Sequence, residues 1–167
     1  MRWSEVGSDS MDFRRLQWLF PVAVALHNAE EAIWMPRWDA RHAAQLPLHP
    51  PGAFEFRLVL VVLTLAAFAV TYFSARRGPG SIWAYLTFGS IVTMLVNVVV
   101  PHIPAAILFR GYAPGVVTAL LINLPLASWL ALHAVRERWV VGKRAVAFGA
   151  GVPILIGSAI SAWIASQ

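Results

Sequence analysis

The chain has 167 residues, of which 59% are hydrophobic and only 13% are charged. A soluble domain of this length carries about a quarter charged residues, so the composition excludes an ordinary cytosolic enzyme, a disordered chain and a repeat solenoid. It indicates an integral membrane protein. The absence of cysteine excludes disulfides, iron–sulfur clusters and thiolate ligands. The formal net charge of +5 fits basic residues in cytoplasmic loops, and we expect no nucleic-acid partner.

The N-terminal segment, residues 1–15, is polar and contains acidic residues. A signal peptide instead has a basic start that is followed at once by an apolar region. We therefore expect this segment to be retained, on the cytoplasmic side, as part of a single transmembrane domain that covers residues 1–167.

Apolar runs follow, each close to the roughly 20 residues that a helix needs to cross a hydrocarbon core. They predict an all-α integral membrane bundle of about five transmembrane helices, antiparallel in sequence order because most connections are short. The third helix should be kinked at Pro101 and Pro104. We expect the proline-containing stretch 36–57 to be an extracytoplasmic loop. The predicted spans are 16–35, 58–75, 82–109, 115–135 and 145–166.

Basic residues are unevenly distributed between the two sides of this arrangement. The asymmetry predicts a multi-pass protein of the cell (inner) membrane, with its N-terminus in the cytoplasm and its C-terminus outside. The side with the N-terminus holds Arg2, Arg14, Arg15, Arg76, Arg77, Arg136, Arg138, Lys143 and Arg144, and the other side holds only Arg37, Arg41, Arg57 and Arg110.

A polar cluster interrupts the first apolar run. His27, Glu30 and Glu31 are spaced i, i+3 and i+4, so they share one face of a helix. An ionised side chain at a helix centre costs about 2.5 to 3.5 kcal/mol, whereas a Leu, Ile, Val or Phe returns only about 0.3 to 0.6. Such groups persist in a membrane when they are neutral, paired, metal-bound or facing a wet cavity. The cluster is therefore a candidate functional site, and the alternative is a buried structural network.

Partners for this cluster are expected from other spans at a similar depth. In the third run, His102 could face the cluster, with Asn97 about one and a half turns deeper; the alternative for His102 is a kink residue that caps a freed carbonyl. Further orienting or substrate-contacting groups are expected from the fourth run and the connection before it, namely Asn123, Thr118 and Tyr112, the last either capping the site or anchoring at the interface.

The residue types indicate two kinds of chemistry. Glu30, Glu31 and His27 are candidate catalytic residues, because flanking carboxylates could act as bases and the imidazole could carry protons. Together with His102 they also form a nitrogen and oxygen ligand set for one divalent transition metal, namely zinc, iron or manganese. A two-iron site needs more carboxylates. No phosphate-binding loop or dinucleotide fingerprint is present, so we expect no nucleotide cofactor.

The leading hypothesis is a membrane-embedded enzyme with an acid–base or mononuclear metal site that acts on a lipid-soluble substrate. The alternatives are a proton- or cation-coupled transporter and a structural membrane subunit. Against transport, no inverted repeat is visible and five spans cannot form two equal halves. The expected partners are membrane lipid and a lipid-soluble small molecule or cation. A homo-oligomer could form through the small residues of the last span, Ala147, Gly151, Gly157 and Ser161.

The chain also resembles a known family. The resemblance is carried by HNAEEAIW from His27, by Asn97 and His102 in an NxxxxH element, and by GYAPGVVTALL from Gly111. In this order they are similar to the HXXEE family of small bacterial integral membrane proteins, over most of residues 19–133. The resemblance implies that His27, Glu30 and Glu31 are the motif residues, and it implies no reaction.

Overall fold

The protein is a bundle of helices, seen in a computed structural model that describes residues 12–46 and 50–166. Four helical stretches are long and apolar enough to cross a membrane, namely Ala53–Arg77, Ile82–Leu108, Val116–Arg136 and Gly142–Ala165. A fifth, α2 (Leu19–His42), is equally long but less apolar, because the polar residues around His27 interrupt it. The predicted helical membrane bundle is confirmed, while Arg2 and most of the N-terminal segment lie outside the described residues.

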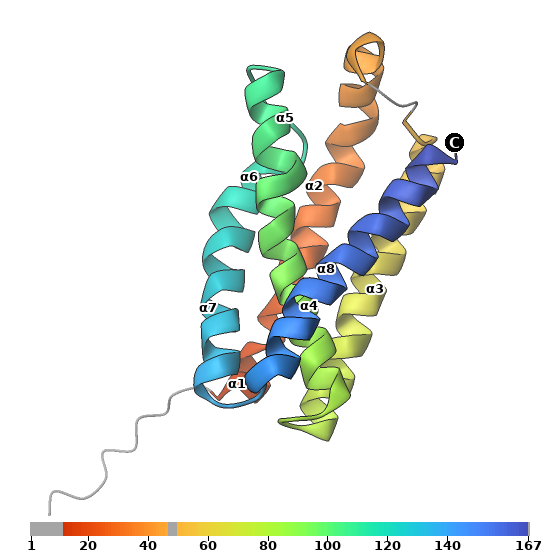
Figure 1. Ribbon diagram of the computed structural model, residues 1–167. Helices are drawn as coiled ribbons and strands as arrows, with labels where there is room; N and C mark the ends of the chain where they lie inside the picture. Colours follow the sequence, from red (N-terminus) through yellow and green to blue (C-terminus); the bar gives the residue numbers. More distant parts are fainter. Residues whose placement is uncertain (1–11, 47–49, 167) are drawn as a thin grey trace, which may run out of the picture.

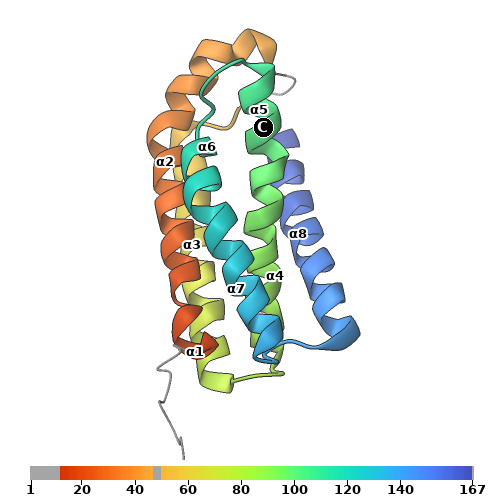
Figure 2. The same cartoon turned by 90° about the vertical axis from the view of Figure 1, so that its left-hand side faces the viewer.

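Successive long helices run in opposite directions (Figure 1), as the short connections predict. Helix α4 (Ile82–Asn97) is central and packs against α3 (Ala53–Arg77), α7 (Leu124–Arg136) and α8 (Gly142–Ala165). Figure 2 shows α7 between α2 and α4. This arrangement places polar residues of α2 opposite the ends of the third and fourth spans.

One end of the bundle is closed by the short helix α1 (Phe13–Leu16), which Asp12 caps through the backbone N–H of Arg15. The backbone N–H of Phe13 donates to Glu137 at 2.7 Å. The Phe13 ring packs 5.2 Å from that of Trp139. Buried apolar side chains of α1, α2, α4 and α7 form the core at this end. The polar cluster lies beyond it, further along α2.

The predicted loop 36–57 is too long, because α2 continues through Pro36 to His42 and α3 begins at Ala53. A proline inside a helix lacks the N–H that would bond the carbonyl four residues earlier. Here that carbonyl belongs to Ala32, and it accepts a hydrogen bond of 3.0 Å from the Arg57 guanidinium of α3. A side chain from the neighbouring helix thus satisfies the group that the proline leaves open, which lets the helix continue.

The third span bends where it was predicted to bend. Val100, directly before Pro101, has non-helical angles (φ −141°, ψ 115°) inside the π-helical segment Val98–His102. Pro104 causes no second break, because it lies in the first turn of α5 (Ile103–Leu108), where a missing N–H is tolerated.

The fourth span carries a second π-helical segment. It begins with α6 (Val116–Thr118), continues through the π-helical residues Ala119–Asn123 and enters α7. The two π-helical segments contact each other. Such irregular turns frequently occur at functional sites, and this pair adjoins the polar face of α2.

Candidate functional site

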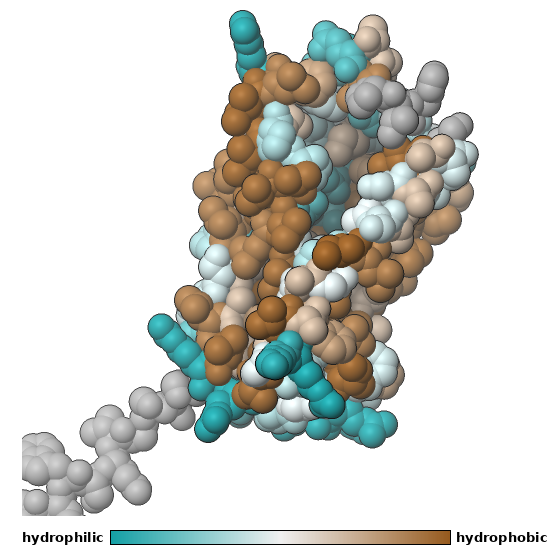
Figure 3. Space-filling view, in the orientation of Figure 1, coloured by the Kyte–Doolittle hydropathy of each residue, from teal (hydrophilic) through white to brown (hydrophobic). Residues whose placement is uncertain are grey.

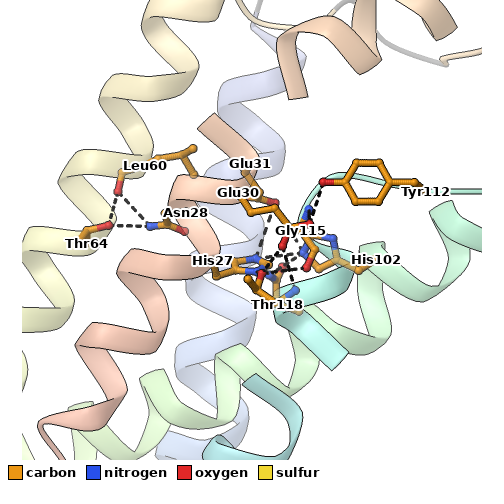
Figure 4. Close-up of polar contacts among 11 residues, drawn as sticks. His27, Asn28, Glu30, Glu31, Leu60, Thr64, His102, Tyr112, Gly115 and Thr118 are labelled. Atoms are coloured by element: carbon orange, nitrogen blue, oxygen red, sulfur yellow. Dashed lines mark hydrogen bonds and ion pairs between the residues drawn. The ribbon is translucent and has the colours of Figure 1, made fainter. Parts of the chain in front are cut away.

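Two histidines and one glutamate meet between α2 and the bend of the third span. The Nε2 atoms of His27 and His102 are 3.2 Å apart. Glu31 Oε1 lies 3.8 Å from His27 Nε2 and 3.6 Å from His102 Nε2. The imidazoles are 1% and 2% exposed, and the Glu31 side chain is 12% exposed. Figure 4 shows these α2 side chains pointing toward His102 and the turn around Gly115.

These three atoms could hold one metal ion. The circle through three points at those separations has a radius of about 2 Å, which equals usual zinc–nitrogen and zinc–oxygen bond lengths. Each residue offers one ligand atom, and these atoms all lie within 4.8 Å of one another. Two imidazoles and a carboxylate also suit iron, and they leave coordination positions open.

Asn97 contacts both imidazoles from the last turn of α4. Its side-chain nitrogen lies 3.0 Å from His27 Nε2 and 3.1 Å from His102 Nε2. The amide thus spans the two ring nitrogens that face the candidate metal position. The sequence predicts an orienting role for Asn97, and the structure places its amide at both rings.

Glu30 is the predicted ligand that does not join this group. Its Oε1 accepts hydrogen bonds from the Tyr112 hydroxyl at 2.8 Å and the Gly115 N–H at 3.1 Å. Its Oε2 accepts from the Thr118 N–H at 2.9 Å and the Thr118 hydroxyl at 2.6 Å. These donors lie at the start of the fourth span, where free backbone N–H groups and the helix dipole favour a carboxylate. Glu30 therefore faces α6, whereas Glu31 faces the histidines.

Thr118 and Tyr112 both lie at the site, on the Glu30 side. The Thr118 hydroxyl is also 2.8 Å from His27 Nδ1, so it links the glutamate to the histidine. Tyr112 lies in the connection between the third and fourth spans, and its hydroxyl contacts Glu30. Burial and the adjacent Glu30 carboxylate raise the pKa of the Tyr112 hydroxyl, which therefore stays a donor.

Asn123 makes no hydrogen bond to the described histidines and glutamates of the cluster. Its side chain is only 1% exposed, and neither amide atom has a hydrogen-bond partner among the described residues. The residue ends the π-helical segment of the fourth span, in which the change of helical pitch turns later side chains away from the positions expected of a regular helix.

A cavity of about 610 Å³ reaches the site from within the bundle. Its walls come from α2, α3, α4 and α8 and are mostly apolar, and His27, Glu31 and Asn97 are among the few polar groups that line it. Figure 3 shows a hollow on this face with apolar borders and hydrophilic groups in its depth. The candidate metal position is thus reached through an apolar chamber.

Sequence reasoning missed Gly115. Its φ is +85°, and a Cβ there would lie 2.9 Å from His27 Cε1 and 3.0 Å from His102 Nδ1. Only glycine fits without strain between this backbone conformation and the two rings. The adjacent Pro114 and Gly115 form a dipeptide that marks turns, and this signal could have identified the position.

Comparisons with known proteins place these residues in a family. A family model described as "Protein of unknown function with HXXEE motif" matches residues 18–130, which include every ligand candidate. The chain is 29% identical over 127 residues to "Uncharacterized protein YrkK" of Bacillus subtilis (strain 168), covering 76% of this chain and 79% of that protein. No solved structure matches this chain. The chain therefore belongs to the family of proteins of unknown function that carry the HXXEE motif.

Proposed function

We propose that the protein is a membrane-embedded enzyme in which His27, His102 and Glu31 hold one divalent transition metal and which acts on a lipid-soluble substrate. The observation that carries the proposal is the convergence of three ligand atoms on one point at the wall of an apolar cavity. Hydrogen bonds with Asn97 and Thr118 join the two imidazoles in a polar network, and such a network alone does not account for Glu31. Glu31 lies beyond hydrogen-bond distance of both Nε2 atoms.

Two imidazoles and one carboxylate form the ligand set of many catalytic metal sites, which keep a position free for substrate. A metal held there would supply Lewis-acid chemistry or, if it is iron, redox chemistry. The ligands themselves are well placed to stay in position. His27 and Glu31 are one helical turn apart on α2, and Asn97 contacts both rings.

The apolar character and the position of the cavity walls indicate the class of substrate. Helices α3 and α8 both line the cavity, which therefore lies between them. Helix α8 packs against α4 and has no buried residue in its apolar 18-residue window. A molecule dissolved in the bilayer could enter between these helices and place a polar group at His27 and Glu31. The apolar walls disfavour a charged water-soluble substrate, which would lose its hydration there.

Metal content tests the proposal. Detergent-purified protein should hold about one transition metal per chain, and His27→Ala or His102→Ala should lose it. His133→Ala is the matched control, because its ring bonds the carbonyl of Trp129 in its own helix, away from the site. Protein that is purified without metal and also resists loading would contradict the metal site and favour acid–base chemistry or proton transport by the same residues.

We further propose that the protein lies in the inner membrane with the α1 end in the cytoplasm. Arg14 and Arg15 lie in α1, and the two turns that join α3 to α4 and α7 to α8 are at the same end of the bundle (Figure 1). The described basic residues of these turns and their helix ends are Arg76, Arg77, Arg136, Arg138, Lys143 and Arg144. Such clustering on one side is typical of cytoplasmic loops.

A further inference from the structure

Consecutive hydrogen bonds through the Thr118 hydroxyl connect Glu30 to His27. We propose that Glu30, acting through Thr118, fixes His27 as the tautomer that carries its proton on Nδ1, so that Nε2 has no proton and can bind a metal. Glu30 and Thr118 are then positioning residues and not ligands. The role of this tautomer in metal binding rests on the proposed function, but the tautomer itself can be measured without any metal.

Which group donates in each of these hydrogen bonds follows from the number of protons available. Thr118 has one hydroxyl proton, and its oxygen lies 2.6 Å from Glu30 Oε2. The hydroxyl proton has two acceptors in reach, the Gly115 carbonyl at 3.2 Å and the Glu30 carboxylate. The carboxylate is nearer and charged and only accepts, so the hydroxyl donates to Glu30. The hydroxyl oxygen is then an acceptor toward His27 Nδ1 at 2.8 Å. Nδ1 must therefore be the protonated nitrogen of His27.

The contacts of the other ring nitrogen of His27, Nε2, also indicate that the proton is on Nδ1. The Asn97 amide nitrogen carries two protons, and it lies within hydrogen-bond distance of Nε2 in both His27 and His102. A proton directed to His27 makes its Nε2 an acceptor, in agreement with a proton on Nδ1, and a metal would displace this amide contact.

This arrangement is what a metal site requires. A histidine ligand usually donates its second ring N–H to a carboxylate, a carbonyl or water, and this bond fixes the ring and its tautomer. Here the carboxylate acts through a threonine hydroxyl. The arrangement also explains why the motif has two adjacent glutamates, because Glu31 faces the metal position on one side of His27 and Glu30 faces Thr118 on the other.

The test is nitrogen NMR of metal-free protein labelled with ¹⁵N-histidine, in which two-bond couplings distinguish the tautomers and His27→Ala assigns the signal. Wild-type His27 should carry its proton on Nδ1. Thr118→Val should abolish this preference and weaken binding of added Zn²⁺ about 10- to 100-fold. Thr118→Ser should restore both. Thr93→Val is the matched control, because that hydroxyl bonds Gly89 in its own helix and should change neither.

Glu30→Gln keeps the test decisive if Thr118→Val does not fold. Glutamine lacks the charge that holds the Thr118 hydroxyl proton, so the hydroxyl can donate to the Gly115 carbonyl or to Nδ1 instead, and the preference of His27 for a proton on Nδ1 should weaken. Wild-type His27 protonated on Nε2, or a tautomer unchanged in both variants, would overturn the inference even if a metal binds. The expected tautomers in a protein that binds no Zn²⁺ would leave this inference standing and refute the proposed metal site.

Discussion

Gly115 is the residue against which both imidazoles pack. Its positive φ would cost another residue about 1 to 2 kcal/mol, and a Cβ would also overlap the two rings. We expect Gly115→Ala to lose more stability than this backbone cost and to weaken metal binding. Gly80→Ala is the matched control, because φ is +74° there and nothing lies within 4 Å of its Cβ. Thermal unfolding and metal titration in detergent measure both effects, and equal losses in the two variants would contradict the packing role.

The contact between Glu31 and His102 should appear as energetic coupling. The two groups are 3.6 Å apart. This distance is too long for a hydrogen bond, but a carboxylate and an imidazole this close in a buried site interact electrostatically, so the effect of changing one depends on the other. A double-mutant cycle of Glu31→Gln with His102→Asn, followed by thermal unfolding, should give a coupling above about 0.5 kcal/mol. Strict additivity would show that the two side chains occupy separate environments and would reduce His102 to a kink residue.

The site residues differ in how far the sequence could predict them. Helical spacing places His27 and Glu31 together, and comparison of depths brings His102 to them. The separate role of Glu30 depends on where the free N–H groups of the fourth span lie, and spacing within α2 contains no such information. Asn123, whose side chain has no hydrogen-bond partner in the described part of the chain, lies in a π-helical turn that hydropathy does not reveal.

Among the helices, the contact between α4 and α8 is set by a glycine. A Cβ at Gly89 would lie 2.6 Å from the backbone carbonyl of Phe148 and 2.6 Å from Val152 Cγ2. We expect Gly89→Ala to push α8 away from α4 and to lower the free energy of unfolding by about 1 to 3 kcal/mol, as other overpacked contacts do. Because α8 forms one wall of the cavity, the variant should also alter binding of lipid-soluble ligands.

Gly151→Ala in α8 is the control for this helix contact. Nothing lies within 4 Å of its Cβ, and alanine is about 1 kcal/mol more favourable than glycine inside a helix. It should therefore be neutral or stabilising in the same thermal unfolding assay. A loss of stability equal to that of Gly89→Ala would show that this face of α8 is also packed, for example in the homo-oligomer that the small residues of this helix predict.

The limits of helix prediction have a physical cause. Apolar runs located the four most apolar spans closely, because insertion depends on summed hydrophobicity. The end of α2 was placed too early, since Pro36 and the charges after it predict a loop. The helix continues because Arg57, far along the chain, bonds the carbonyl that Pro36 leaves free. Such tertiary compensation is not encoded in any local window.

For the whole molecule, the distribution of charge predicts the topology. A reporter fused at the C-terminus should be extracytoplasmic, and one inserted near Gly78, beside Arg76 and Arg77, should be cytoplasmic. These two positions lie at opposite ends of the bundle (Figure 1). Opposite readings at both positions would invert the proposed orientation while leaving the fold and the site unchanged.

The metal site is tested most directly by X-ray absorption of the metal in the purified wild-type protein. Because the circle through the three ligand atoms has a radius of about 2 Å, we predict nitrogen and oxygen ligands at about 2.0 to 2.2 Å. Outer-shell scattering should show two imidazoles, and His102→Ala should remove one of them. A metal without imidazole scattering, or a spectrum unchanged in His102→Ala, would contradict a centre held by His27, His102 and Glu31.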